Sequence, residues 1–371
     1  MNIKFVIPCL LGLESIIANE MKELGAENVM SENGRVLFEG DENILARVNI
    51  CSRYSERVQI LLGEFYARSF EELFQGTRAL EWENWIGAYD TFPVKGYSLN
   101  SKLFSVSDCQ SIIKKAVVER LKSKYGISWF EETGPVHQIQ FSIMKDKVSL
   151  LIDTTGVGLH KRGYRPQANA APIKETLAAS LCNLAKLRSY HTLYDPMCGS
   201  GTILIEGAMM VHNIAPGVNR NFSAERWDVI DENVWTQERN RARELVNYDS
   251  DFIAYGSDID EVALEIARIN AKRAGVERKI KFEKADIRDF EFKSEMGTVI
   301  CNPPYGERLL DIEEAQRLYK IMGEKFTAQR GRSYYVISPS EEFEKEFGRK
   351  ADKRRKLYNG MIKCQLFMYF K

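Results

Sequence analysis

Residues 1–65 alternate short apolar runs of period two with amphipathic segments whose apolar positions recur at helical spacing. One run is a hairpin that turns at Asn33-Gly34, a pair typical of two-residue turns. The order strand, helix, hairpin, helix, strand predicts a small ferredoxin-like α+β domain over residues 1–65. Its expected elements are residues 2–7, 13–24, 28–40, 43–53 and 57–65.

The next stretch, residues 66–155, has the pattern of a second α+β domain. Its two strands are joined at Lys145-Asp146, which is typical of a tight turn. The expected helices are residues 69–79 and 108–125, and the expected strands are residues 137–144 and 147–153.

From about residue 190 the pattern becomes a regular alternation of strands and helices, after a linker and leading helix over residues 156–189. This alternation predicts an α/β domain over residues 190–371 with a mostly parallel, doubly wound sheet. The last two strands meet at Asn359-Gly360 and predict a C-terminal antiparallel hairpin. The other strands are expected at residues 192–195, 252–257, 279–283, 298–301 and 334–338, and the helices at 201–212, 260–274, 312–327 and 341–347.

Charge and cysteine content narrow the classes of protein. Lys plus Arg and Asp plus Glu both total 52, so any nucleic-acid site must be a local patch rather than a global field. The seven cysteines are scattered without metal-ligand spacing, which argues against a zinc site or a disulfide framework and favours a reducing cytoplasm. We expect neither a signal peptide nor a membrane span, because every apolar run is too short to cross a bilayer.

The stretch "LYDPMCGSGTILIE" predicts a cofactor loop between a strand and a helix. Gly199 and Gly201 allow a tight turn with close approach of the backbone to a ligand. Leu204 stands where a dinucleotide fingerprint needs a third glycine, and no Gly-Lys-Ser/Thr follows, so neither a dinucleotide nor a P-loop phosphate is expected. Asp195 at the strand end suits the ammonium of a zwitterion. The expected ligand-binding residues are Asp195, Pro196, Cys198, Gly199, Ser200, Gly201 and Thr202.

Two further carboxylates follow successive strands. Asp258 is placed to accept hydrogen bonds from two ribose hydroxyls, and Asp286 is placed to accept one from an adenine amine. As an exposed carboxylate at a strand end, Asp258 is expected to carry little packing. Ile259 and Ile287, which follow them, belong to the same expected cofactor site. Asp258 comes much further after Gly199 than the roughly 20 residues of the dinucleotide fingerprint, so the region between them contains an insertion.

The stretch "ICNPPYGERL" leaves an apolar strand through Asn302 into two prolines that cannot donate to a sheet. It resembles the motif of amino-methyltransferases, which methylate exocyclic amines of nucleobases. The Asn302 side chain and the Pro303 carbonyl can accept the hydrogens of such an amine, and Tyr305 can stack on the base. The expected catalytic residues are Asn302, Pro303, Pro304 and Tyr305, and Asn302 also borders the cofactor site.

Taken with "LHKRGYRPQANAAPIKETLAA", these motifs make the chain resemble bacterial THUMP-domain RNA methyltransferases, in the single-domain form related to the large-subunit (23S) rRNA guanine 2-amino methyltransferase. The resemblance implies a class I S-adenosylmethionine-dependent methyltransferase domain of Rossmann-like fold at the C-terminal end. It also implies a THUMP RNA-binding domain over residues 66–155. The implied cofactor is S-adenosylmethionine, and the implied partner is structured RNA, rRNA before tRNA.

Three alternatives stay open at the level of sequence. The same chemistry could act on tRNA or on an adenine amine, including DNA adenine, or the chain could be an RNA-binding assembly factor without activity. The intact loop and NPPY motif speak against the last. Cys301 is expected to be a core residue rather than a covalent nucleophile, because no Pro-Cys pair stands there.

The chain has two strongly basic stretches, and the first of them is a candidate RNA contact. In "HKRGYR", basic and aromatic residues interleave in a way that suits phosphate contact and stacking, although a solvated linker is equally compatible. Residues 349–356 are expected to form a solvated sheet edge. The candidate RNA-binding residues are His160, Lys161, Arg162, Tyr164 and Arg165.

Overall fold

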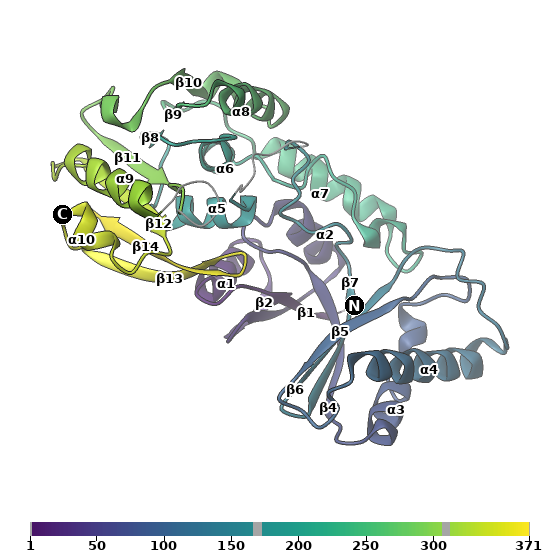
Figure 1. Ribbon diagram of the computed structural model, residues 1–371. Helices are drawn as coiled ribbons and strands as arrows, with labels where there is room; N and C mark the ends of the chain where they lie inside the picture. The colour runs from purple at the N-terminus through teal and green to yellow at the C-terminus, as the bar shows by residue number, and fades with distance from the viewer. Residues whose placement is uncertain (1, 166–172, 306–311, 371) are drawn as a thin grey trace. The chain divides into compact units, whose positions relative to one another are not determined.

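The structure is a computed structural model that describes residues 2–165, 173–305 and 312–370 (Figure 1). The chain divides into two compact units, and each has its own seven-stranded sheet. Neither unit is a single continuous stretch. The first unit takes residues 1–8, 18–159 and 220–240, and the second takes residues 9–17, 160–219 and 241–371.

The sheet of the first unit has the strand order β2-β3-β1-β4-β7-β6-β5. All neighbouring strands are antiparallel except β5 and β6, which are parallel. The strands are β1 (Ile3–Pro8), β2 (Glu27–Glu32), β3 (Arg35–Gly40), β4 (Gln59–Tyr66), β5 (Val94–Leu99), β6 (Gln138–Met144) and β7 (Lys147–Asp153). The helices of this part of the chain are α1 (Glu14–Glu23, which crosses between units), α2 (Glu42–Cys51), α3 (Phe70–Arg78), the one-turn η1 (Trp82–Asn84) and α4 (Val106–Tyr125).

The sequence pattern predicts two α+β domains here, and in the structure their strands form one continuous sheet. Strand β4 is the joint, because Ile60 pairs with Phe5 of β1 on one side and with Ile152 of β7 on the other. All three side chains are buried, so the two halves share one apolar layer. A bulge between Leu61 and Gly63 shifts the register within the joint.

Strand β5 is not predicted by the sequence pattern. It pairs with β6 alone at the edge of the sheet, and its side chains alternate only between partly and fully exposed. Gly96 lies at its centre, where a Cβ atom would come within 2.2 Å of the Phe141 carbonyl oxygen. A strand without a buried face and with a central glycine has almost no hydrophobic periodicity, which is why the pattern misses it.

The inserted segment, residues 220–240, belongs to the first unit although it interrupts the sequence of the second. Its 3-10 turn η2 (Ser223–Arg226) is bound at the end of β7, where Ala224 N donates to Thr154 O at 3.0 Å. The Trp227 ring is fully buried and stacks on His137 at 4.3 Å between ring centroids. The segment continues into α7 (Glu232–Glu244).

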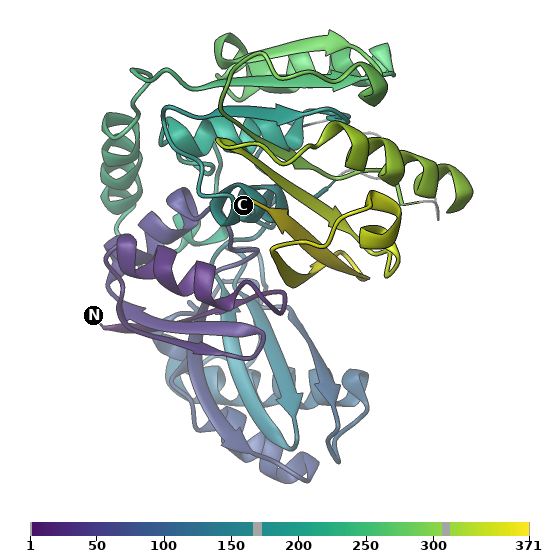
Figure 2. The same ribbon diagram turned by 90° about the vertical axis from the view of Figure 1, so that its left-hand side faces the viewer.

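The sheet of the second unit has the order β10-β9-β8-β11-β12-β14-β13. The first five strands are parallel, and β14 is antiparallel to both β12 and β13, as predicted for a doubly wound sheet that ends in a hairpin (Figure 2, yellow). The strands are β8 (Thr192–Asp195), β9 (Ile253–Asp258), β10 (Ile280–Lys284), β11 (Gly297–Cys301), β12 (Arg332–Ser338), β13 (Lys353–Asn359) and β14 (Ile362–Tyr369). The helices are α5 (Glu175–Leu184), α6 (Thr202–Val211), α8 (Glu261–Arg273), α9 (Ile312–Lys325) and α10 (Phe343–Phe347), with the short turns η3 (Glu277–Lys279) and η4 (Ile287–Asp289).

The predicted elements of this unit therefore have the right type and order. Helices α9 and α10 and strands β11, β12 and β14 enclose an aromatic core, in which Phe326 stacks on Tyr334 and Phe343 stacks on Phe367. This core holds the carboxyl end of β11, Cys301, completely buried. The residues that follow β11 consequently start from a rigid base.

Candidate functional site

Three strand ends meet at one edge of the second sheet. β8 ends at Asp195, β9 ends at Asp258, and Asn302 directly follows β11. Since β8 lies between β9 and β11, and the chain passes from β8 first to one side and then to the other, this edge is the topological switch point of the sheet. Ligands of open α/β sheets bind outside the carboxyl ends of the strands at such a point.

The predicted cofactor loop adopts a conformation that needs its glycines. Gly199 has φ 49° and Gly201 has φ 78°, both in the left-handed region. A Cβ atom at Gly201 would lie 3.1 Å from the Cβ of Ala267, so the loop also packs tightly against α8. The amide nitrogen of Asn270 on α8 donates to the Ser200 carbonyl at 3.1 Å and supports the loop from below.

Asp258 has a role that the sequence does not reveal. One of its carboxylate oxygens accepts a hydrogen bond from Gly199 N at 2.8 Å, and the other accepts one from Asp260 N at 3.0 Å. The carboxylate therefore fixes the cofactor loop and the start of α8. We expected Asp258 to contribute little to packing. The two hydrogen bonds show that this is wrong, because removing the carboxylate would also release the loop.

Asp195 is the most deeply buried carboxyl of the site. Its side chain is 2% exposed and accepts a hydrogen bond from Met197 N at 3.3 Å. Burial raises the pKa of this carboxyl to about 8, against a weaker opposing effect of the Met197 hydrogen bond. The ionised form of a carboxyl buried in this way is strongly stabilised by a cation placed beside it. This fits the predicted contact with an ammonium group.

Asp286 is paired already. Arg288 donates to both of its carboxylate oxygens, at 2.9 Å through Nε and 2.7 Å through Nη2, and these hydrogen bonds lower the pKa of Asp286 to about 2. A contact of Asp286 with an adenine amine would have to share these oxygens. Of the neighbouring apolar residues, Ile259 is 67% exposed at the strand end, whereas Ile287 is buried in the core.

The NPPY motif forms a hydrogen-bonded group with the C-terminal hairpin. The Tyr305 hydroxyl donates to the side-chain oxygen of Asn302 and accepts from the amide nitrogen of Asn359, the last residue of β13, at 3.3 Å. Burial raises the pKa of Tyr305 well above its ordinary value, so the hydroxyl keeps its proton. The oxygen predicted to receive a substrate amine thus already accepts a hydrogen bond from a neutral donor. The sequence assigns Asn359 only to a turn, and no local signal links it to Tyr305.

Cys301 has the structural role that the sequence predicts. It is completely buried, and burial raises the pKa of its thiol well above the ordinary value. A buried protonated thiol is a poor nucleophile.

The predicted RNA contact at "HKRGYR" needs a correction. Arg162 and Tyr164 are buried and both bind the carboxylate of Glu206 on α6, with Arg162 Nε at 3.4 Å and the Tyr164 hydroxyl at 2.9 Å. Arg165 donates to the Thr202 hydroxyl at 2.9 Å and forms an ion pair with Glu175 at 3.0 Å. These side chains support the helix behind the cofactor loop, so they are not free to bind phosphates.

In the same stretch His160 is partly exposed and Lys161 is exposed. The stretch continues into residues 166–172, which lie outside the described residues, as do residues 306–311 after the NPPY motif. The tyrosine and glycine of "HKRGYR" are compatible with a buried segment. The sequence does not indicate Glu206 as the partner, because this residue is distant in the chain.

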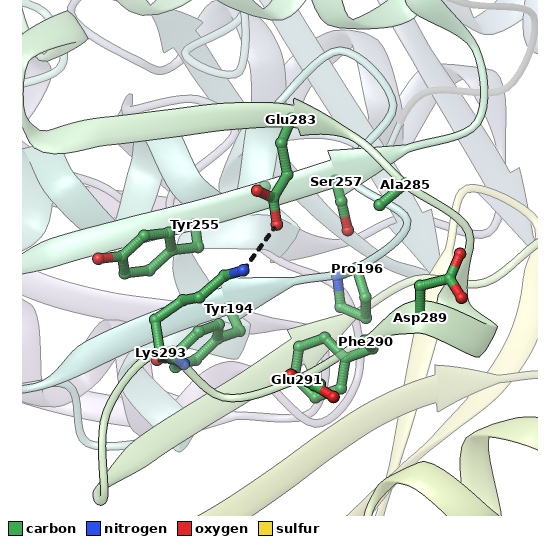
Figure 3. A pocket seen from close by; sticks show the side chains of 11 residues that line it. Tyr194, Pro196, Tyr255, Ser257, Glu283, Ala285, Asp289, Phe290, Glu291 and Lys293 are labelled. Carbon is green, nitrogen blue, oxygen red and sulfur yellow. Dashed lines mark hydrogen bonds and ion pairs between the residues drawn. The ribbon is translucent and has the colours of Figure 1, made fainter.

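A separate small pocket opens on the face of β8, β9 and β10 (Figure 3). Tyr194 and Tyr255 stack along it at 5.4 Å, and the ammonium of Lys293 lies 3.6 Å from the Glu283 carboxylate across it. Among the predicted cofactor residues that the structure describes, Pro196 alone lines it. The pocket is therefore a neighbour of the strand-end site rather than part of it.

Within the described ranges, no group of three or more His, Cys, Asp or Glu side chains could hold a metal ion. No helix in the same ranges is long and apolar enough to cross a membrane.

The fold and the strand-end residues together define a Rossmann-like methyltransferase domain that follows an α+β N-terminal unit. Comparison with protein families makes the assignment specific: the chain belongs to the RMKL-like methyltransferase family, whose methyltransferase domain matches residues 162–367. The RlmL ferredoxin-like domain matches residues 4–59 and the THUMP domain matches residues 67–153. The predicted family, fold class and cofactor, S-adenosylmethionine, are confirmed.

Similar proteins share nearly the whole chain. "Putative RNA methyltransferase YpsC" of Bacillus subtilis is 42% identical over 97% of this chain and 94% of its own length. "Ribosomal RNA large subunit methyltransferase K/L" of Psychromonas ingrahamii is 35% identical over 99% of this chain, which spans only 50% of that protein. The crystal structure of "SMU.472, a putative methyltransferase complexed with SAH" is 42% identical, covers 100% of this chain and 98% of its own, and has a TM-score of 0.94.

Proposed function

We propose that this protein methylates an exocyclic base amine in RNA, and that its substrate is the guanine 2-amino group in 23S rRNA. The family and the names of the similar RNA methyltransferases support RNA as the substrate. The observation that carries the choice of an amine is Asn302, whose side-chain oxygen lies beside the cofactor edge and accepts a hydrogen bond from a neutral donor. The adenine amine is the second candidate, since the same oxygen would accept from it.

The residues at the strand ends fit S-adenosylmethionine. Asp195 offers a buried carboxyl for an ammonium, and the loop at Gly199 and Gly201 allows close backbone approach. Asp258 ends strand β9 beside this loop, and we assign it to the ribose hydroxyls. When bound, the cofactor supplies an electrophilic methyl group on a sulfonium. Held by these residues, the cofactor would give up that methyl group to the amine nitrogen, which would release one proton to solvent.

The contribution of this chain to that step is positioning. An aromatic amine is a weak nucleophile because its lone pair is delocalised into the ring. Acceptance of its hydrogens by Asn302 and by the Pro303 carbonyl favours a pyramidal nitrogen with the lone pair directed at the methyl group. The interaction strengthens as positive charge develops on the nitrogen, so it lowers the barrier more than it tightens binding.

Asn302→Ala therefore should slow methyl transfer about ten- to two-hundred-fold, the equivalent of a charge-assisted hydrogen bond of about 1.5–3 kcal/mol. Cofactor affinity, measured by calorimetry, should hardly change. Single-turnover rates on rRNA from a strain that lacks the gene would measure the effect, with the exposed Asn233→Ala variant as the control. A wild-type rate in Asn302→Ala would show that the amine is not bound there. Nucleoside mass mapping of rRNA and tRNA from that strain would identify the base and the RNA.

A further inference from the structure

Asn359 stands at a position where the turn of the C-terminal hairpin does not need an asparagine. The strand register pairs Asn359 with Ile362, so Gly360 and Met361 make the two-residue turn between β13 and β14. Of Asn359, Gly360 and Met361, only Gly360 has a left-handed backbone, with φ 63°. Asparagine is depleted in strands. The turn therefore does not explain the asparagine at the end of β13.

The side chain of Asn359 shares the buried face of the hairpin. Leu357 and Cys364 lie opposite each other in the ladder, and both are buried. Asn359 follows Leu357 by two residues, so its side chain points to the same face. A polar group on such a face is expected to have a hydrogen-bond partner. That partner is the Tyr305 hydroxyl, which accepts from the Asn359 amide nitrogen at 3.3 Å.

The Tyr305 hydroxyl is thereby held between the NPPY motif and the hairpin. It donates to the side-chain oxygen of Asn302, and Cys364 of β14 lies beside it. Tyr305 as a whole is still partly exposed. The hydrogen bond from Asn359 therefore fixes the direction of the tyrosine side chain without enclosing it completely.

We propose that Asn359 is a positioning residue for RNA binding, which holds the Tyr305 ring in the direction that stacking on the target base requires. The inference rests on the proposed function, because it takes Tyr305 as the stacking partner of the base. A side chain that is already held in its binding direction loses less conformational freedom when the ligand binds. Stacking acts on the bound base before methyl transfer, so the effect of Asn359 should fall on the KM for RNA and not on kcat.

The test is steady-state methyl transfer to rRNA from a strain that lacks the gene, with wild type, Asn359→Ala, Tyr305→Phe and the double variant. Asn359→Ala should raise the KM for RNA about two- to ten-fold, as expected for one neutral hydrogen bond, with kcat nearly unchanged. Tyr305→Phe should raise KM at least as much. The double variant should have the KM of Tyr305→Phe alone, because Asn359 then has no hydroxyl to hold.

A second variant and a control separate positioning from a purely structural role. Asn359→Leu has a similar size, suits the apolar face and cannot hydrogen-bond, so it should show the same rise in KM with a melting temperature no lower than that of wild type. The control is Met361→Ala at the tip of the same hairpin, where the side chain is 98% exposed, and it should keep the wild-type KM.

Three results would overturn the proposal. The first is an unchanged KM in Asn359→Leu, and the second is a KM in the double variant equal to the product of the two separate effects. The third is an equal rise in Met361→Ala, which would mean that the hairpin tip contacts RNA directly. The proposed function fails separately, if the wild-type chain transfers no methyl group to an RNA amine.

Discussion

The carboxyl of Asp195 makes the stability of the cofactor-free protein depend on pH. Its folded pKa of about 8 lies above the value of about 3.9 expected in an unfolded chain, so the folded state holds an extra proton between these values. Stability contributed by the protonated form is present below pH 4 and is lost as pH rises through 8. Asp195→Asn removes this titration, and the variant should therefore gain stability relative to wild type as pH rises from 5 to 9.

The gain should reach several kcal/mol, at about 1.4 kcal/mol for each pKa unit. Urea unfolding of both proteins across this pH range would measure it, and the difference between them cancels the titration of other groups. Parallel stability profiles would mean that Asp195 is ionised in the folded protein. The same variant should bind S-adenosylmethionine more weakly, because an amide cannot neutralise an ammonium.

Tyr305 combines two effects that a pair of substitutions can separate. Tyr305→Phe keeps the aromatic face and removes the hydroxyl that occupies the Asn302 oxygen. We expect its methyl-transfer rate to be no lower than that of wild type. Tyr305→Ala also removes stacking, worth about 1–3 kcal/mol per base, and should raise the KM for RNA as well as slow turnover. Single-turnover and steady-state assays distinguish the two, and a Tyr305→Phe variant as impaired as Tyr305→Ala would assign the hydroxyl a direct role.

At the scale of residues, the sequence indicates candidate site residues where a polar residue or a glycine follows the end of a strand. Gly199, Asp258 and Asn302 can be brought together from the amino-acid pattern alone, because parallel strands end at the same edge of a sheet. Asn359 and Glu206 cannot, because each meets its partner through packing between elements that are distant in the chain. Whether the predicted residues bind cofactor and base stays a prediction for the experiments above.

At the scale of elements, the buried pair of Arg162 and Glu206 joins the segment after the first unit to helix α6. Removing one partner of a buried ion pair leaves the other charge without compensation, which typically costs about 3–5 kcal/mol. Arg162→Met should therefore lower the free energy of unfolding by about that amount, with little dependence on salt. Urea unfolding measures the change, and Lys161→Met, at the exposed neighbouring position, is the control. A stable Arg162→Met protein with weakened RNA binding would restore the original interpretation of "HKRGYR".

Prediction of elements fails in an instructive way in the first unit. Strands with one buried face, such as β6 and β7, are found to within a residue or two, because alternation marks them. The pairing of β4 with both β1 and β7 leaves no local trace. Sheet order depends on long-range contacts, and a joint between two sheets has the same alternating pattern as an ordinary strand.

At the scale of the whole molecule, the inserted segment makes a simple division at residue 160 unsuitable. A fragment of residues 160–371 would carry Trp227 and Trp235, both buried in the full chain, without the unit that buries them. We expect this fragment to aggregate, because exposed apolar patches of this kind drive association. Soluble expression and size-exclusion chromatography would test this.

The structure also suggests a fragment that should behave well. His212 and Asn247 lie on either side of the insertion, and Asn247 N donates to His212 O at 2.9 Å. A short Gly-Ser linker between them can replace residues 213–246 in the same fragment. If this fragment is no more soluble than the simple one, the exposed segment is not the cause of aggregation.

The division of the first unit into three stretches also has a consequence for synthesis on the ribosome. The unit's main stretch ends at residue 159, but its last stretch ends only at residue 240. At about 5–20 residues per second, roughly 4–16 seconds pass between the two. During that time His137 and the end of β7 are exposed, because residues 220–240 do not yet cover them. The second unit must also begin to fold around residues 220–240, although these belong to the first unit. The N-terminal half of this protein therefore cannot mature before much of the catalytic half has been translated.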